Sequence, residues 1–297
     1  MSAFTPHLER LAAATRWNYR ASRESSAEPA AWAAIALAAH GLHDAAARPA
    51  QWLAGLQQSD GSVGVSESQD DPRWPTSLAM LAWHAAAGDA ATRRFAEHVE
   101  RAATWSLAAR GKTAPRSSHV GHDTQLTGWS WAADTHSWLE PTCMFVMGLR
   151  AAGFDDHQRV REGVRLIVDR LLPDGGANYG NTIVLGQPLV AHVQPTGLAL
   201  LALGGEEIAD DRIGKSLEYL AASIGPQTAA PSLALACLGL AAHGRRPAAA
   251  DEWITGALAQ RDAALLAVYE QSLLLLAAAP SPGTAVAASR FSREVAI

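Results

Sequence analysis

An internal repeat is the strongest constraint that this sequence places on its fold. Six short apolar helices are predicted, and most of their starts follow a polar loop. Three starts carry a Pro-Thr pair, at Trp74–Pro75–Thr76, Glu140–Pro141–Thr142 and Gln194–Pro195–Thr196. Looser versions occur at Glu28–Pro29, Ala230–Pro231–Ser232 and Glu270–Gln271–Ser272. Because proline at the first helical position loses no hydrogen bond, the repeated pattern marks helix N-termini. An internal repeat fixes the architecture before any single residue is interpreted.

The apolar helices alternate with amphipathic ones. The apolar set is predicted over 29–40, 75–87, 141–152, 195–203, 231–243 and 271–279. The amphipathic set is predicted over 6–21, 44–57, 90–110, 157–172, 210–224 and 247–260. A helix that is apolar all round must be buried all round, so the apolar set forms an inner ring. We predict an all-α fold, a single (α/α)6 toroid of six outer–inner helix pairs, with an open solenoid as the alternative.

Composition limits the class of protein. The chain has 297 residues, of which 48% are hydrophobic and 18% charged, with a net charge of -5. We predict one toroid domain over 1–297, with a C-terminal tail over 280–297. No basic stripe indicates a nucleic-acid partner. Cys143 and Cys237 lie in apolar helical segments, which is typical of buried thiols in a reducing compartment. With neither a signal peptide nor a transmembrane segment in the pattern, we expect a cytoplasmic protein.

One loop carries a family resemblance. The segment from Trp52 to Gly64 reads WLAGLQQSDGSVG, and weaker copies read GWSW from Gly128 and DGGANYG from Asp174. The pattern resembles the Gln-Trp repeat of squalene–hopene and oxidosqualene cyclases, also found in protein prenyltransferase β subunits. The resemblance implies a terpene cyclase-like α/α toroid. Its chemistry is local, since Gln bonds backbone groups at a helix end and Asp-Gly makes a tight turn. We therefore expect Trp52, Gln57, Asp60 and Gly61 to be structural.

The site is expected where the inner helices begin. All six inner helices are predicted to run in one direction, so their N-termini gather at one mouth of the toroid. The long loops over 111–140 and 173–194 lie at the same mouth, and long loops on a rigid scaffold commonly carry binding residues. The residues before the helix starts include Glu28, Trp74, Glu140, Gln194 and Glu270. Three carboxylates are thus predicted to surround the mouth.

Glu140 is the candidate catalytic acid. The resemblance implies this role, because class II terpene cyclases carry Asp-x-Asp-Asp-Thr-Ala at the equivalent helix start, and Glu140 falls on the central carboxylate. Both flanking aspartates are missing, and Asp134 and His136 are candidates to replace them. The alternative for Glu140, as for Glu28 and Glu270, is a carboxylate that interacts only with the helix end.

Aromatic side chains and polar neighbours complete the predicted site. The predicted substrate-binding residues are Trp74, Trp129, Trp131, Trp138, Phe145, Gln194, Glu28 and Glu270. Aromatic faces stabilise cations and bind apolar chains. Packing between helices is the alternative role for the tryptophans.

Metal binding and cofactors are not predicted. His119 and His122 with Asp123 form a possible ligand cluster in one loop, but histidines in a polar loop are usually solvated. Asp70 and Asp71 precede Pro72 in what is more simply an acidic turn. No phosphate loop or dinucleotide motif occurs.

Four functions are compatible with the pattern. The first is a terpene cyclase-like isomerase or lyase that binds an apolar, isoprenoid-like small molecule and uses Glu140 as general acid. The second is a non-catalytic carrier of a lipid or isoprenoid, and the third is an interaction scaffold. The fourth is a toroid enzyme acting on a polar substrate such as a glycan. The fold alone does not separate them.

Overall fold

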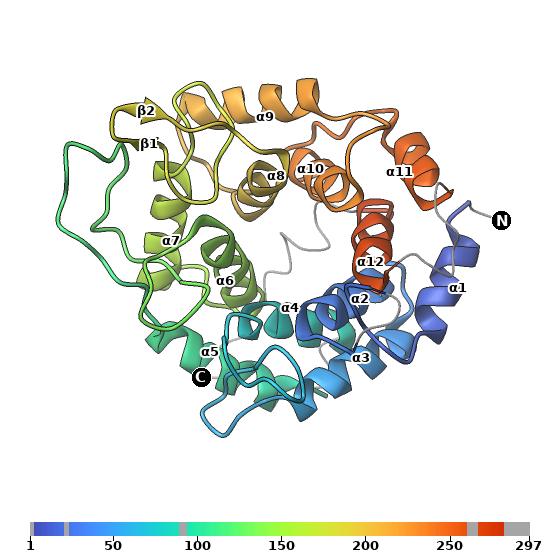
Figure 1. Cartoon of the computed structure of the whole chain (residues 1–297). Coiled ribbons are helices and arrows are strands. Elements are labelled where there is room, and N and C mark those ends of the chain that lie inside the picture. The colour runs from blue at the N-terminus through green and yellow to red at the C-terminus, as the bar shows by residue number, and fades with distance from the viewer. Residues whose placement is uncertain (1–2, 21–23, 89–93, 260–266, 282–297) are drawn as a thin grey trace, which may run out of the picture.

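Two concentric rings of helices surround one axis in the computed structural model of the chain (Figure 1). The structure describes residues 3–20, 24–88, 94–259 and 267–281. The inner helices are α2 (Ala27–Ala39), α4 (Thr76–Ala87), α6 (Leu139–Ala151), α8 (Val193–Ala202), α10 (Ala230–Ala242) and α12 (Val268–Ala277). The outer helices are α1 (Thr5–Ala13), α3 (His43–Gly55), α5 (Ala96–Ala108), α7 (Gln158–Asp169), α9 (Asp211–Ser223) and α11 (Ala250–Ala259). The predicted (α/α)6 toroid is confirmed.

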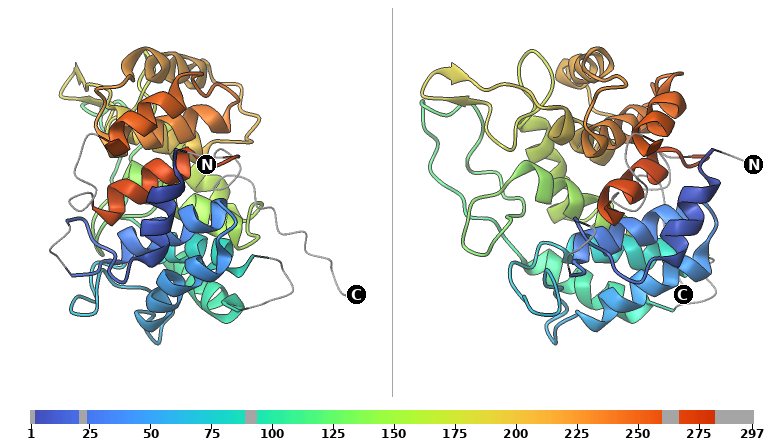
Figure 2. Two further views of the ribbon diagram at one scale, coloured as in Figure 1. Left: turned by 90° about the vertical axis from the view of Figure 1, so that its right-hand side faces the viewer. Right: turned by 45° about the vertical axis from the view of Figure 1, so that its right-hand side comes forward.

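The inner ring closes on itself. Each inner helix packs against the next along the chain, and α12 packs back against α2, which excludes the open solenoid. Figure 2 shows the same stack of helices from the side, with the first and last helices adjacent. The inner helices are apolar on every face and almost wholly buried, as the absence of a polar stripe predicted. Cys143 and Cys237 are buried free thiols within this ring.

Glycines allow the inner helices to approach closely. Gly197 of α8 faces α10, and a Cβ atom at this position would lie 2.6 Å from the carbonyl carbon of Leu235. Gly239 of α10 faces back toward Gly197 in the same way. A Cβ at Gly148 of α6 would lie 2.5 Å from the carbonyl oxygen of Ser77 in α4. The ring is therefore narrow at these crossings and has no space for larger side chains.

Gly197→Ala is expected to destabilise the protein by about 1–3 kcal/mol, because the new methyl group overlaps backbone that has no room to move. Gly214→Ala is the matched control. Gly214 is also helical, but a Cβ atom there would have no other atom within 4 Å, so alanine should stabilise by about 0.5–1 kcal/mol. Urea denaturation of the two variants should give changes of opposite sign. Equal changes would contradict the close crossing of α8 and α10.

The C-terminal ends of the inner helices share one face. His40, after α2, bonds the Leu275 carbonyl of α12 through Nε2 at 2.8 Å, and His243, after α10, bonds the Leu200 carbonyl of α8 at 2.9 Å. Arg150 of α6 donates to the Ala202 carbonyl of α8 at 2.5 Å. Such donors satisfy carbonyls that a helix end leaves unpaired. The N-terminal ends must then gather at the opposite face, as predicted.

Several helix boundaries differ from the prediction. α2, α6 and α8 each begin two residues earlier than expected, so their prolines lie within the first turn, and α12 begins three residues earlier. A proline still costs nothing there, because first-turn N–H groups have no partner in the helix. Glu28, Glu140 and Gln194 are consequently the second residues of α2, α6 and α8, and not the residues before them. The first outer helix ends at Ala13, well short of the predicted residue 21.

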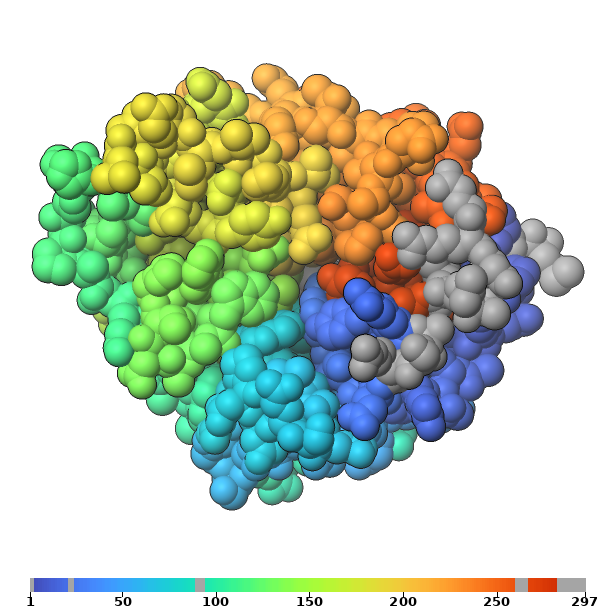
Figure 3. Space-filling model, viewed as in Figure 1, coloured from blue at the N-terminus to red at the C-terminus, as the bar shows by residue number. Residues whose placement is uncertain are grey.

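Two long loops cover the mouth of the toroid beside α6. The loop over 170–192 contains a hairpin of β1 (Ile183–Val184) and β2 (Gln187–Pro188), turned by Leu185 and Gly186, both with positive φ. The loop over 109–138 joins it, since the Gly121 N–H donates to the Ile183 carbonyl at 3.0 Å. These segments form one side of the face seen in Figure 3.

Within the described residues, no helix has both the length and the apolar character needed to cross a bilayer. The predicted tail over 280–297 lies, beyond residue 281, outside the described residues.

Candidate active site

A buried threonine anchors each of three inner-helix starts. The hydroxyl of Thr76 accepts from the Val63 N–H at 2.8 Å, and Thr196 accepts from the Ala177 N–H at 2.8 Å. Thr142 does the same for the Trp129 N–H at 3.1 Å. Each hydroxyl also donates at 2.6 Å to a carbonyl just before or at the start of its own helix. The Pro-Thr repeat therefore locks a preceding loop onto each helix start and fixes the mouth.

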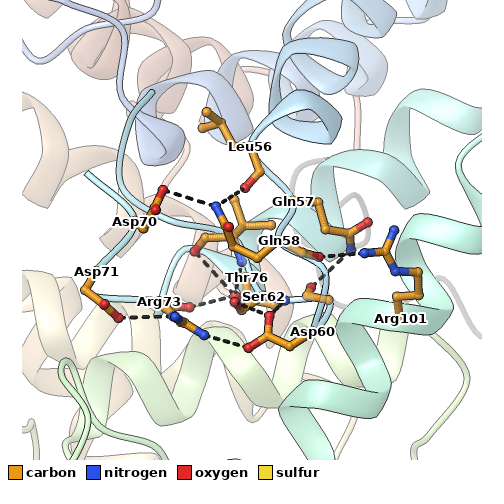
Figure 4. Close-up of polar contacts among 12 residues, drawn as sticks. Leu56, Gln57, Gln58, Asp60, Ser62, Asp70, Asp71, Arg73, Thr76 and Arg101 are labelled. Carbon is orange, nitrogen blue, oxygen red and sulfur yellow. Dashed lines mark hydrogen bonds and ion pairs between the residues drawn. The ribbon is translucent and has the colours of Figure 1, made fainter. Parts of the chain in front are cut away.

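The Gln-Asp-Gly loop has the structural role expected for it (Figure 4). Gln57 donates through Nε2 to the carbonyls of Gly61 and His98, at 3.1 and 2.9 Å. Asp60 accepts from the Ser62 N–H at 3.0 Å and forms an ion pair with Arg73 at 2.6 Å. Gly61 has φ +94° and lies against the Arg101 backbone, which excludes a side chain. The motif ties the loop to α5 and takes no part in the mouth chemistry.

Polar side chains from the second residue of four inner helices meet at the mouth. They are Glu28 of α2, Glu140 of α6, Gln194 of α8 and Tyr269 of α12. Gln194 donates through Nε2 to Glu140 Oε1 at 3.3 Å. The charge of Glu28 acts on Glu140, and the charges of Glu28, Glu140 and Glu270 all act on Tyr269. Glu28 and Glu140 thus lie at one opening, whereas Glu270 is placed only beside Tyr269, the residue before it in α12.

Burial dominates the electrostatics of Glu140. The residue is only 7% exposed. Loss of hydration raises the pKa of its carboxyl to about 7, with the nearby Glu28 charge adding to the rise and the Gln194 hydrogen bond opposing it. A carboxyl with this pKa is about half protonated near neutral pH, so it can donate a proton there.

Glu28 is held by two donors. The Tyr19 hydroxyl donates to Glu28 Oε2, and Trp32 Nε1 donates to Glu28 Oε1 at 3.3 Å. The ring of Tyr19 lies 5.1 Å from the ring of Tyr269, and the charge of Glu28 also acts on Tyr269. Burial raises the pKa of Glu28, while both donors favour its charged form. The two carboxyls therefore have different environments in one small site.

The aromatic candidates form a separate group beside α6. Trp74 and Trp131 meet edge to face with ring centroids 4.8 Å apart, and Trp129 stacks on Phe145 at 5.3 Å. All four line a pocket of about 560 Å³, and Trp105 of α5 completes its aromatic wall. Glu140 is not among the lining residues.

The other predicted residues lie at the rim. Asp134 lines the same pocket, and its side chain is 85% exposed, 3.3 Å from Lys112 Nζ. His136 is exposed and its ring lies 4.5 Å from that of Trp138, the residue just before α6. The structure records no hydrogen bond between either side chain and Glu140 among the described residues.

The loop histidines do not assemble a ligand set. Asp123 forms an ion pair with Arg116, and burial together with Arg170 lowers the pKa of His122 to about 4. Across the described ranges, no three His, Cys, Asp or Glu side chains are placed to hold one metal ion.

Sequence reasoning missed three aromatic contributors. Tyr269 lay outside the inner helix predicted to begin at residue 271, although it occupies the same helical position as Glu28 and Glu140. The sequence predicts Tyr19 within an outer helix, but that helix ends at Ala13. The sequence predicts Trp105 within an amphipathic helix and indicates no site role for it. Alignment of the inner helices by their second residue would have identified Tyr269.

No protein-family model matches the sequence, and no curated protein is significantly similar to it. Solved structures do match. Two are a reducing-end-xylose releasing exo-oligoxylanase, as a point mutant and in complex with xylose. Each is 14% identical with a TM-score of 0.54, over 88% of this chain and 83% of the other. A third, the endo-β-1,4-glucanase CMCax from Acetobacter xylinum, is 13% identical with a TM-score of 0.54, over 95% and 99%. At this identity the likeness shows the toroid fold alone.

These neighbours correct the predicted relationship. The resemblance to squalene cyclases and prenyltransferases is wrong, because the matching toroids are a xylanase and a glucanase. The Gln-Asp-Gly motif does not identify the family, because its hydrogen bonds stabilise the conformation of a loop. Toroids of different function can share such a loop.

The predicted apolar, isoprenoid-like substrate and the terpene cyclase function are wrong for the same reason. The matching structures act on or bind sugars. The mouth itself carries two carboxyls, an amide and two phenols. The alternative of a toroid enzyme acting on a glycan fits these findings better.

Proposed function

We propose that this protein is a glycoside hydrolase that cleaves an oligosaccharide at the mouth of the toroid. The observation that carries the proposal is the pair of Glu28 and Glu140, one partly buried and one buried carboxyl in one site, whose environments differ. Glycosidases in general use one protonated carboxylic acid and one carboxylate on either side of the scissile bond. The sugar-cleaving neighbours of the same fold support this substrate class.

Glu140 is the general acid. Its pKa of about 7 keeps a proton available at neutral pH, and that proton passes to the glycosidic oxygen as the bond to the anomeric carbon breaks. Gln194, bonded to Oε1, orients the carboxyl. When Glu140 holds the proton, repulsion between the two groups is removed and Glu28 carries the negative charge.

Glu28 is the ionised partner. Burial raises the pKa of Glu28, and the donors from Tyr19 and Trp32 oppose this rise and fix the orientation of the carboxylate. A carboxylate there stabilises the positive charge that develops at the anomeric carbon in an oxocarbenium-like transition state. A water molecule forms the new bond to that carbon and gives its proton to the Glu28 carboxylate, which completes the hydrolysis. Tyr19, Trp32 and Tyr269 are positioning residues in this scheme.

The test is hydrolysis of xylohexaose and cellohexaose, the oligosaccharides closest to the substrates in the neighbours' names. We expect shorter sugars from the wild type, and a rate at least about 100-fold lower for Glu140→Gln and for Glu28→Gln. An aryl glycoside with a good leaving group needs little acid assistance, so it should restore Glu140→Gln but not Glu28→Gln.

Glu218→Gln, which makes the same charge change on an exposed position of α9, is the control and should leave the rate unchanged. A wild type that shortens neither oligosaccharide, or a Glu140→Gln variant with the full rate on both, would remove the basis of the proposal.

A further inference from the structure

The aromatic pocket beside α6 has no part in the proposed bond cleavage. It lies between the N-terminal end of α4, the C-terminal end of α5 and the segment over 129–134, and its volume is about 560 Å³. Trp74, Trp105 and Trp131 are each only partly buried. Three indole side chains thus line one solvent-accessible space.

The rim of this pocket carries charged groups. Asp71 and Asp134 have side chains 72% and 85% exposed. Asp71 pairs with Arg73 at 3.1 Å and Asp134 pairs with Lys112 at 3.3 Å, and Arg110 also lines the pocket. Asp134 is held in the left-handed region with φ 63°, which aims a short polar side chain from a tight turn. Apolar walls with a few carboxylates at the rim are typical of a site for a small ligand.

The pocket is displaced from the axial carboxyls. Phe145, on the pocket wall, follows Glu140 by five residues along α6. Five residues turn a helix by about 140°, so the two side chains leave opposite sides of α6. Both sites nevertheless open at the mouth, because Trp138, at the start of α6, bonds the Trp129 carbonyl through its N–H at 2.9 Å. In Figure 3 the segments before α4 and α6 meet on this face.

We propose that this pocket binds a sugar ring of a saccharide chain, as a second saccharide site beside the cleavage site that a hexamer engages together with that site and a dimer does not. A sugar ring has an apolar C–H face that packs on an indole and hydroxyl groups at its edge that donate to carboxylates. Trp74, Trp105 and Trp131 supply the faces, and Asp71 and Asp134 supply the acceptors. The ligand class rests on the proposed function, but binding here does not require Glu140 or Glu28.

Isothermal titration of the Glu140→Gln variant with xylo- and cello-oligosaccharides of two to six units tests the site without turnover. Adding Trp131→Ala should weaken binding of the hexamers by about tenfold or more and leave the dimers nearly unchanged. Trp131→Phe keeps an aromatic face and should weaken binding less. Asp134→Asn tolerates the same backbone conformation and should also weaken hexamer binding.

Three outcomes would overturn the site. These are hexamer binding equal in all variants, equal loss for dimers and hexamers, or binding of tetramethylammonium in place of sugars, which would identify an aromatic cage for cations. Thermal melts of each variant separate unfolding from lost affinity. If no oligosaccharide is cleaved but hexamer binding still depends on Trp131, the proposed hydrolysis fails and the second site stands.

Discussion

Glu140→Gln is expected to stabilise the protein by about 3 kcal/mol at pH 8, and to leave its stability nearly unchanged at pH 4. The folded protein raises the pKa of Glu140 from an ordinary value of 4.5 to about 7, mainly by burial. Each unit of this difference corresponds to about 1.4 kcal/mol. Glutamine fills the same space, is uncharged, and still offers Oε1 to Gln194.

The direction of this pH dependence follows from the protons that the folded and unfolded states bind. Between pH 4.5 and 7 the folded state holds a proton on Glu140 that the unfolded state has released, so the stability of the wild type falls as the pH rises. Above pH 7 the folded protein contains a buried carboxylate and the full cost is present. Below pH 4.5 both states are protonated, and no difference from glutamine remains.

Urea denaturation at intervals from pH 4 to pH 8 measures this effect directly. Glu218→Gln on the surface of α9 removes the same charge, and its stability should stay within about 0.5 kcal/mol of the wild type at every pH. A gain for Glu140→Gln that did not depend on pH would exclude a raised pKa and, with it, the acid role of Glu140.

If Glu140→Gln gains stability and loses activity, the free energy that the fold loses by burying the Glu140 carboxylate serves the function. A buried carboxyl that merely capped a helix would stabilise the fold through the dipole, and its removal would cost about 0.3–1 kcal/mol. A catalytic acid instead keeps a proton at neutral pH at the expense of stability. The sign of the change at pH 8 therefore separates the two roles considered for Glu140.

The toroid could be predicted from sequence because its pattern is redundant. Six helices without a polar face leave no position for them except an inner ring, and the Pro-Thr starts set their common direction. Their N-termini at Glu28, Glu140 and Gln194 then meet by geometry alone. The prediction needed no knowledge of any individual side-chain contact.

The chemistry of the site was less predictable because it depends on contacts between distant segments. Tyr19 reaches Glu28 only because the chain leaves its helix at Ala13, and no residue nearby signals that end. Trp105 joins Trp74 and Trp131 only through the crossing of α5 with α6. The sequence predicts the structural role of the loop motif at Gln57 correctly, but the family resemblance drawn from it is wrong. Hydrogen bonds within a turn carry no information about the substrate.

Trp129→Ala is expected to destabilise the protein by about 3–5 kcal/mol, the cost typical of truncating a buried tryptophan. Trp129 is 1% exposed, and its Nε1 donates to the Ser106 carbonyl at 2.9 Å. Its ring stacks on Phe145 at 5.3 Å, and the Arg159 guanidinium lies 4.3 Å from a ring centroid. Truncation would leave a cavity, an unpaired carbonyl and a buried cation without its aromatic partner.

Trp131→Ala is the control for the destabilisation by Trp129→Ala, because Trp131 lines the same pocket but is partly exposed. We expect a cost of about 1 kcal/mol there, measured for both variants by urea denaturation followed by circular dichroism, which does not depend on the tryptophans. Trp129→Phe should lie between them, since it keeps the stack and loses the N–H bond. A small cost for Trp129→Ala would mean that Trp129 is available to a ligand, as the sequence predicts. A cost for Trp131→Ala as large as that for Trp129→Ala would make Trp131 a packing residue, and Asp134→Asn would then be the decisive variant for the second saccharide site.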